Sequence, residues 1–175
     1  MRINLTSSLS ALAIAGVLSV AQTAPGYAAD ETEMAKNAKV TIGQAVEAAE
    51  QKGMGKATEA EFEDDYGGRW EVKVLSQGGD KLTKYFVDPN SGEVTGQEEQ
   101  TFEKYWTMLK PADFQKAQTQ LKEAIAAAEK AANGKATSAE VERSGDAVAY
   151  EIDVATADGS KDVDVDANGK AVVDD

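Results

Sequence analysis

The sequence predicts an α+β protein built from two repeated modules, each with one helix packed on a three- or four-stranded antiparallel sheet. The first observation is a repeat: residues 42–63 and 121–142 align without a gap and share the letters GKAT at residues 55–58 and 134–137. The second is that, in each copy, an apolar pattern of helical period precedes segments that alternate between apolar and charged residues. That alternation is typical of strands with one solvated face. Two long copies, rather than many short ones, favour tandem domains over a solenoid.

Residues 1–29 have the three-part order of a secretory signal peptide. Arg2 makes the beginning positive, residues 9–20 are apolar, and small residues precede Asp30. The apolar run is shorter than the roughly 20 residues that a membrane-spanning helix needs, which disfavours the alternative of a retained anchor. We therefore expect cleavage after Ala28 or Ala29 and a periplasmic or secreted protein.

The first module is expected at residues 40–96. Thr41 and Gln44 have the spacing of a capping box, so they predict the start of a helix. An apolar stripe follows, and Gly53 or Gly55 is expected to end the helix. Alternating patterns then predict strands at residues 58–63, 70–74 and 82–87 and a short fourth strand at 93–95.

A helical linker is expected at residues 97–112. Phe102, Tyr105, Trp106 and Leu109 have the spacing of one apolar helix face. Such a face most often docks onto neighbouring elements, here onto both modules. The alternative is an exposed partner surface that contains Tyr105 and Trp106.

The second module is expected at residues 113–175. Asp113, after Pro111, predicts the cap of one long helix whose apolar stripe runs from Phe114 to Ala128 and which ends at Gly134. Strands are expected at residues 139–142, 147–155, 161–165 and 171–173. Because modules this small have marginal cores, we expect the two copies to pack together.

These elements resemble the PepSY domain. The resemblance rests on WEVKV at residues 70–74 and FVDPNSGEV at 86–94, and on YEIDV at 150–154 and VDVDANGKAV at 163–172. It implies an exported or membrane-attached α+β module without shared catalytic residues. PepSY domains occur in the propeptides of thermolysin-like peptidases, where a role in restraining the peptidase has been proposed. No peptidase domain follows here, so we expect any such role to act in trans.

The composition argues against an enzyme and against a cofactor. The chain has no cysteine and no histidine, which excludes thiolate zinc sites and the commonest general base. Its 31 acidic and 18 basic residues give a net charge of −13. A field of that sign repels nucleic acid and favours solubility, basic partners or cations.

Asp164, Asp166 and Asn168 match the opening of an EF-hand calcium loop, and they are the only weak metal candidates in the sequence. The simpler interpretation is a hairpin turn, in which Asp and Asn bond their own backbone and Gly169 adopts a positive φ.

Two functions are consistent with these observations. The first is an exported, non-enzymatic binding module that acts on an envelope protein, for example a peptidase, through strand addition at a sheet edge. The second is a protein that binds or senses a cation or small ligand with its acidic C-terminal hairpin.

Overall fold

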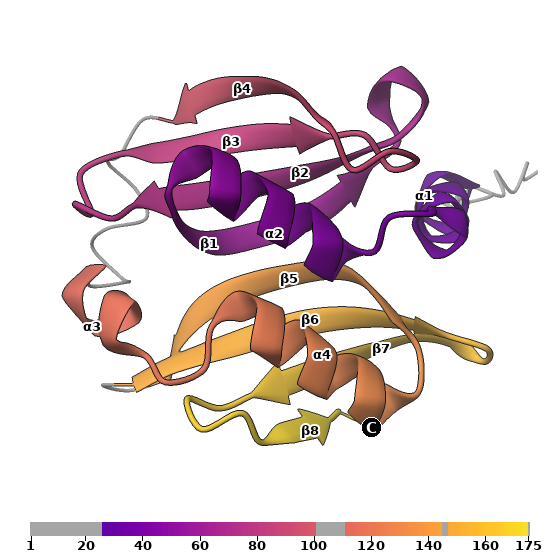
Figure 1. Ribbon diagram of the computed structural model, residues 1–175. Coiled ribbons are helices and arrows are strands. Elements are labelled where there is room, and N and C mark those ends of the chain that lie inside the picture. The colour runs from indigo at the N-terminus through magenta and orange to yellow at the C-terminus, as the bar shows by residue number, and fades with distance from the viewer. Residues whose placement is uncertain (1–25, 101–110, 145–146, 175) are drawn as a thin grey trace, which may run out of the picture.

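The computed structural model describes residues 26–100, 111–144 and 147–174. The strands in these residues form one continuous antiparallel sheet, in the order β4-β3-β2-β1-β5-β6-β7-β8 (Figure 1). Their bounds are β1 Gly55–Glu63, β2 Arg69–Ser76, β3 Leu82–Val87, β4 Val94–Gln100, β5 Lys135–Ser144, β6 Ala147–Thr156, β7 Gly159–Val165 and β8 Ala171–Val173. This arrangement confirms the predicted α+β class and the two helix-plus-sheet modules.

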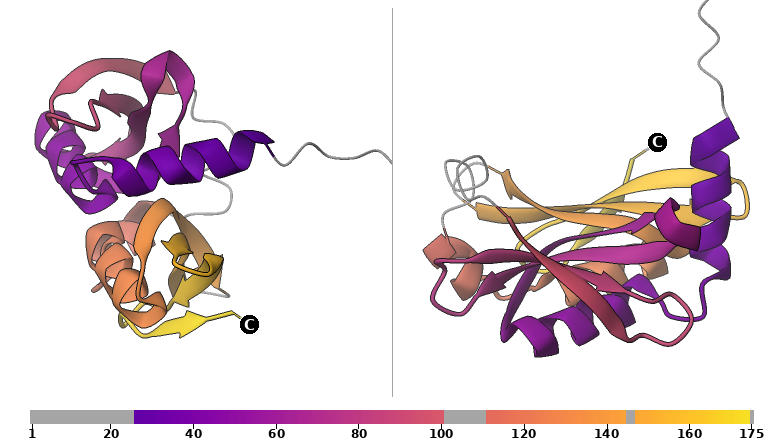
Figure 2. Two further views of the ribbon diagram at one scale, coloured as in Figure 1. Left: turned by 90° about the vertical axis from the view of Figure 1, so that its right-hand side faces the viewer. Right: turned by 90° about the horizontal axis from the view of Figure 1, so that it is seen from above.

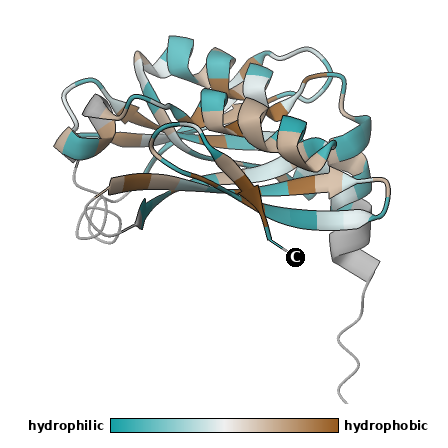
Figure 3. Ribbon diagram, turned by 90° about the horizontal axis from the view of Figure 1, so that it is seen from below, coloured by the Kyte–Doolittle hydropathy of each residue, from teal (hydrophilic) through white to brown (hydrophobic). Residues whose placement is uncertain are grey.

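Two helices cover the same face of the sheet. Helix α2 (Ile42–Gly53) packs on β1 and β2, and helix α4 (Leu121–Ala132) packs on β5 to β8. Figure 3 shows the hydrophobic segments of these helices turned toward the sheet. One hydrophobic core runs through both modules, from Ile42 and Trp70 to Ile125 and Tyr150. None of the helices in the described part of the chain is long and apolar enough to cross a membrane.

The modules join edge to edge through β1 and β5. Residues 59–61 pair with residues 138–140, with Glu59 opposite Glu140 and Glu61 opposite Ser138. Helix α1 (Gly26–Asn37) crosses this boundary and contacts both strands (Figure 2). The processing site expected at Ala28 or Ala29 falls at the start of this helix. We name the paired residues 59–61 and 138–140 the junction.

The shared GKAT letters form the same bulge in each module. Ala57 donates its amide to Glu50 of α2 at 2.8 Å, and Ala136 donates to Glu129 of α4 at 3.0 Å. The register of each strand shifts at the following threonine. The threonine hydroxyls then donate to carbonyl oxygens of the neighbouring strand: Thr58 donates to Lys73, and Thr137 donates to Asp153.

Glycine has a packing role at the end of each helix. Helix α2 ends at Gly53, one of the two glycines expected there, whereas α4 ends at Ala132, before the expected Gly134. The residue after each helix, Met54 (φ 47°) or Asn133 (φ 55°), adopts the left-handed conformation. A Cβ on Gly55 would lie 2.0 Å from the carbonyl oxygen of Leu75, and one on Gly134 would lie 2.4 Å from that of Ala155. Glycine is therefore required there because the helix-to-strand turn presses against another strand.

The prediction of a single long helix after Pro111 was wrong. The chain instead forms a short helix α3 (Pro111–Lys116) and then α4. Thr119 breaks the helical path because its carbonyl accepts from Tyr150 and its hydroxyl donates to Ala167 at 3.1 Å. Asp113 lies within α3, where its carboxylate is 3.8 Å from the guanidinium of Arg143. Tertiary anchoring thus overrides a continuous apolar stripe.

The helix expected at residues 97–112 is wrong at its beginning, whereas residues 111 and 112 at its end are helical and belong to α3. Residues 97–100 extend β4, because they pair with residues 82–85 of β3. Residues 101–110, with Phe102, Tyr105, Trp106 and Leu109, lie outside the described residues.

Candidate functional site

The face of the sheet opposite α2 and α4 carries most of the chemistry in the described residues. Because side chains alternate along a strand, the register defines rows of neighbours that cross this helix-free face. One row contains Phe86, Glu71, Glu61, Ser138, Asp153 and Asp162. The next contains Lys84, Lys73, Glu59, Glu140, Glu151 and Asp164.

The first module balances its acids on this face. Lys73 pairs with Glu59 at 2.5 Å. Glu71 is buried and accepts hydrogen bonds from both Arg69 and Lys84. Despite this burial, the two cations hold the pKa of Glu71 below its usual range. Three cations, Arg69, Lys73 and Lys84, therefore offset part of the negative charge on this half of the face.

The second module leaves its acids on this face largely uncompensated. Glu142, Glu151, Asp162 and Asp164 are exposed there, and no basic residue occupies their rows within β5, β6 and β7. The neighbouring Glu142 raises the pKa of Glu151. Burial, with Asp162 alongside, raises the pKa of Asp153. The helix-free face is thus polarised from mixed charge in the first module to negative charge in the second.

Glu61 lies at the junction, opposite Ser138. Burial raises the pKa of Glu61 to about 7, and the carboxylates of Glu59 and Glu63 add to this effect. A pocket of about 260 Å³ opens beside it, between α1 and the strands. Its lining combines acids, hydroxyls and apolar groups: Glu31, Thr32, Ala35, Glu61, Phe62, Thr137, Ser138 and Asp153.

Three carboxylates near this pocket come close enough together to consider a cation. Oxygen atoms of Glu61, Glu63 and Glu71 lie within 4.8 Å of one another. However, Arg69 and Lys84 already engage the two oxygens of Glu71. One of the three carboxylates is therefore committed to ion pairs, and the cluster does not amount to a free set of ligands.

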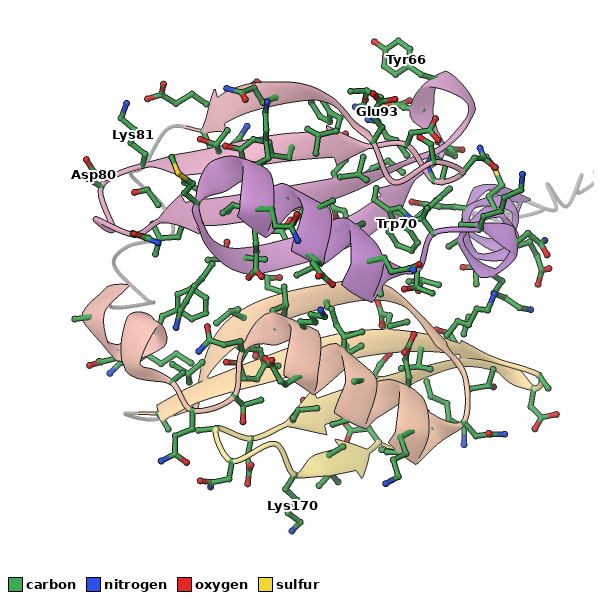
Figure 4. The ribbon with its side chains drawn as sticks, viewed as in Figure 1. Tyr66, Trp70, Asp80, Lys81, Glu93 and Lys170 are labelled. Atoms are coloured by element: carbon green, nitrogen blue, oxygen red, sulfur yellow. The ribbon has the colours of Figure 1, made fainter. Side chains whose placement is uncertain are left out.

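An aromatic group flanks the first module's side of the face. The guanidinium of Arg69 lies 4.2 Å from the ring centroid of Phe86 and 5.0 Å from that of Tyr66. Tyr66 is 92% exposed and has a left-handed φ of 57°, which is uncommon for an aromatic residue. Its ring projects away from the sheet (Figure 4). Aromatic residues and arginine are enriched in protein interfaces, so this group is a candidate contact.

The structure separates the residues of the calcium-loop motif. Asp164 lies on β7 and faces the helix-free side, whereas Asp166 and Asn168 lie in the β7–β8 turn. One carboxylate oxygen of Asp166 accepts the amides of Asn168 at 2.8 Å and Lys170 at 3.0 Å. Gly169 has a φ of 82°. The first module builds its turn in the same way around Asp88, which suits a structural turn and leaves Asp166 with less capacity for a metal.

The partner surface expected from the aromatic linker, Tyr105 and Trp106, lies outside the described residues. Sequence reasoning missed two features of the site. It did not identify the pairing of β1 with β5, which brings acids of both modules together. It also did not single out Tyr66, although the pair Gly67-Gly68 after an aromatic residue was a signal that a turn presents this side chain.

The described residues form a duplicated helix-backed antiparallel sheet with one open, charged face. Comparison with protein families matches residues 39–98 and 121–175 to PepSY, described as "Peptidase propeptide and YPEB domain". The chain belongs to the PepSY family.

Comparison with solved structures gives a match to a crystal structure described as a "putative lipoprotein" from Clostridium difficile 630. The two are 18% identical, and the match covers 82% of this chain and 98% of that chain with a TM-score of 0.48. The search of curated proteins found no match.

Proposed function

We propose that this protein is an exported, non-enzymatic binding protein whose helix-free sheet face docks onto a basic surface of an envelope protein. The observation that carries the proposal is the uncompensated negative charge of Glu142, Glu151, Asp162 and Asp164 on that face. Complementary charge increases association rates and selects partners. The aromatic group of Tyr66, Arg69 and Phe86 supplies contact area at the other side of the same face.

A peptidase is the first partner class to test, because the family is named for peptidase propeptides. Binding in trans would cover part of the peptidase surface and modulate its activity. The absence of histidine and cysteine from the whole sequence supports a role in binding rather than catalysis. The signal peptide predicted at residues 1–29 supports export, and with it an envelope partner.

The test is site-dependent capture from an envelope extract. The chain from residue 30 onward is immobilised as wild type, as an open-face variant and as a matched control. The open-face variant carries Glu142→Gln, Glu151→Gln and Asp164→Asn. The control carries Glu93→Gln, Glu99→Gln and Asp158→Asn, which removes the same charge from positions outside the rows of the helix-free face.

The proposal expects a basic protein to bind the wild type and the control, with binding that weakens as salt is raised and is lost in the open-face variant. Cross-links should then map to β6 and β7. Equal capture by both variants, or capture that salt does not weaken, would count against docking on this face. Inhibition assays with any captured peptidase decide whether binding modulates its activity.

A further inference from the structure

The junction between the modules places acids against acids. Glu59 lies directly opposite Glu140, and like charges in that relation destabilise a strand pair. The pairing is also short, because it involves residues 59–61 and 138–140, whereas β1 pairs with β2 along its whole length. The pairing between the two halves of the sheet is thus short, and it places acids of one module against an acid of the other.

We propose that the junction is a pH-responsive contact, closed in weakly acidic solution and loosened near neutrality by repulsion between the acids that the β1–β5 pairing brings together. This inference is independent of the proposed partner, since it concerns only the contact between the two modules of one chain. It requires that the acids in question face one another across packed elements, and that opening the junction returns them to water.

Every element packed around Glu61 contributes a group to its surroundings. Acids predominate: Glu59 and Glu63 on β1, Glu71 on β2, Glu140 on β5, Asp153 on β6 and Glu31 on α1. The cations are Lys73 on β2 and Lys84 on β3. Glu140 in turn faces the acids Glu59, Glu142 and Glu151 and the cation Lys73. Lys73 forms an ion pair with Glu59, and Lys84 forms one with Glu71. The two lysines therefore cannot fully offset the negative charge of the junction.

Burial is the largest cause of the raised pKa of Glu61 and of Glu140. Opening the junction would remove the cover that α1, β5 and β6 give to Glu61, so its pKa would return toward the ordinary value of 4.5. The closed junction therefore binds a proton more strongly than the open one. Its added stability is fully present below that ordinary value and is lost as the pH rises to about 7.

A second link between the modules lies on the helix side. Lys122 of α4 and Glu47 of α2 form an ion pair at 2.6 Å. We therefore expect loosening on the helix-free side, with separation of β1 from β5, while the helices stay in contact. The pocket between α1 and the strands would widen at the same time, because Glu61 and Asp153 line it.

Amide hydrogen exchange on the chain from residue 30 onward tests the proposal. Protection factors, corrected for the intrinsic effect of pH, are measured at about pH 5 and about pH 8 for the junction. Amides in the β2–β3 and β6–β7 pairs serve as internal references. We expect junction protection to fall by about tenfold or more relative to the references. Unchanged relative protection would overturn the proposal.

Two variants identify the groups responsible. Glu61→Gln combined with Glu140→Gln is neutral at both positions, so its junction should stay protected at the higher pH. Glu98→Gln is the matched control, because Glu98 lies on β4, opposite Lys84 and away from the junction. The control should lose protection as the wild type does. The proposal is wrong if the double variant keeps the full pH dependence or if the control abolishes it.

Discussion

The indole nitrogen of Trp70 donates a hydrogen bond of 2.9 Å to the carbonyl oxygen of Val40. The second module repeats this relationship, since the hydroxyl of Tyr150 donates to the carbonyl of Thr119. Val40 and Thr119 each immediately precede the N-cap residue of a helix, Thr41 of α2 and Gln120 of α4. In each module, an aromatic side chain on the second strand therefore fixes where the helix begins.

Tyr150→Phe tests this anchor, because it removes the hydroxyl and keeps the ring. Burial raises the pKa of Tyr150 to about 12, so the hydroxyl stays protonated and able to donate over the ordinary pH range. Its loss leaves the buried carbonyl of Thr119 without that partner, so we expect about 1–2 kcal/mol of destabilisation in urea unfolding. The 92% exposed Tyr66 is the control: Tyr66→Phe should leave the unfolding midpoint unchanged. Equal midpoints for Tyr150→Phe and wild type would contradict the anchor.

Gly55→Ala is expected to destabilise the first module strongly. The added Cβ would meet the carbonyl oxygen of Leu75 at 2.0 Å, so the backbone of the turn or of β2 must move. We expect a loss of about 2–4 kcal/mol, measured by urea unfolding.

Gly43→Ala provides the matched control, since Gly43 lies within α2 and its added Cβ would meet nothing closer than 4.0 Å. Alanine favours helix over glycine, so this variant should gain about 0.5–1 kcal/mol. If both substitutions shift stability in the same direction, the crowding argument for Gly55 fails.

The sequence predicted the modules well because their elements are locally encoded. The capping box of Thr41 and Gln44 and the alternation along β2 and β6 each determine structure within a few residues. The break between α3 and α4 could not be predicted in this way, because Thr119 is held by Tyr150 and Ala167, which lie far along the chain.

The candidate site was less predictable than the fold for a related reason. Alternation showed that Glu59 and Glu61 share a face, but nothing in the local pattern indicates which strand of the second module pairs with β1. The pairing with β5 gives Glu140 and Asp153 their place beside these acids. Strand order is a long-range property, so the charged junction emerged only from the three-dimensional arrangement.

The stability of the protein should decrease between weakly acidic and neutral pH. The folded pKa of Glu61 is raised from 4.5 to about 7, so its protonated form stabilises the fold below 4.5 and this contribution is lost as the pH rises to about 7. Thermal unfolding across this window should show a falling melting temperature. Glu61→Gln should flatten the curve, and an unchanged slope in that variant would show that other groups are responsible.

Below this window the trend should reverse. Arg69 and Lys84 hold the pKa of Glu71 below its usual value, so its contribution is present above 4.5 and is lost as the pH falls through the lowered folded pKa. Glu71→Gln should remove that acid-side loss while lowering stability at neutral pH, because Arg69 and Lys84 lose their charged partner. Circular dichroism melts across the acid range measure both effects, and an acid limb that survives in the variant would assign it elsewhere.

Tyr66→Ala separates a role in binding from a role in folding. Because the ring is 92% exposed, its removal should cost little packing energy. The left-handed φ at this position costs a similar amount for tyrosine and for alanine. The melting temperature should therefore change little. Capture of a basic partner should weaken by about tenfold, since an exposed aromatic residue at an interface commonly contributes more than 1 kcal/mol.

Trp70→Phe gives the opposite pattern, because Trp70 is buried beside α2 and its loss should lower stability without changing the surface. If Tyr66→Ala retains full capture while the open-face charge variant loses it, the partner contacts only the acidic half of the face.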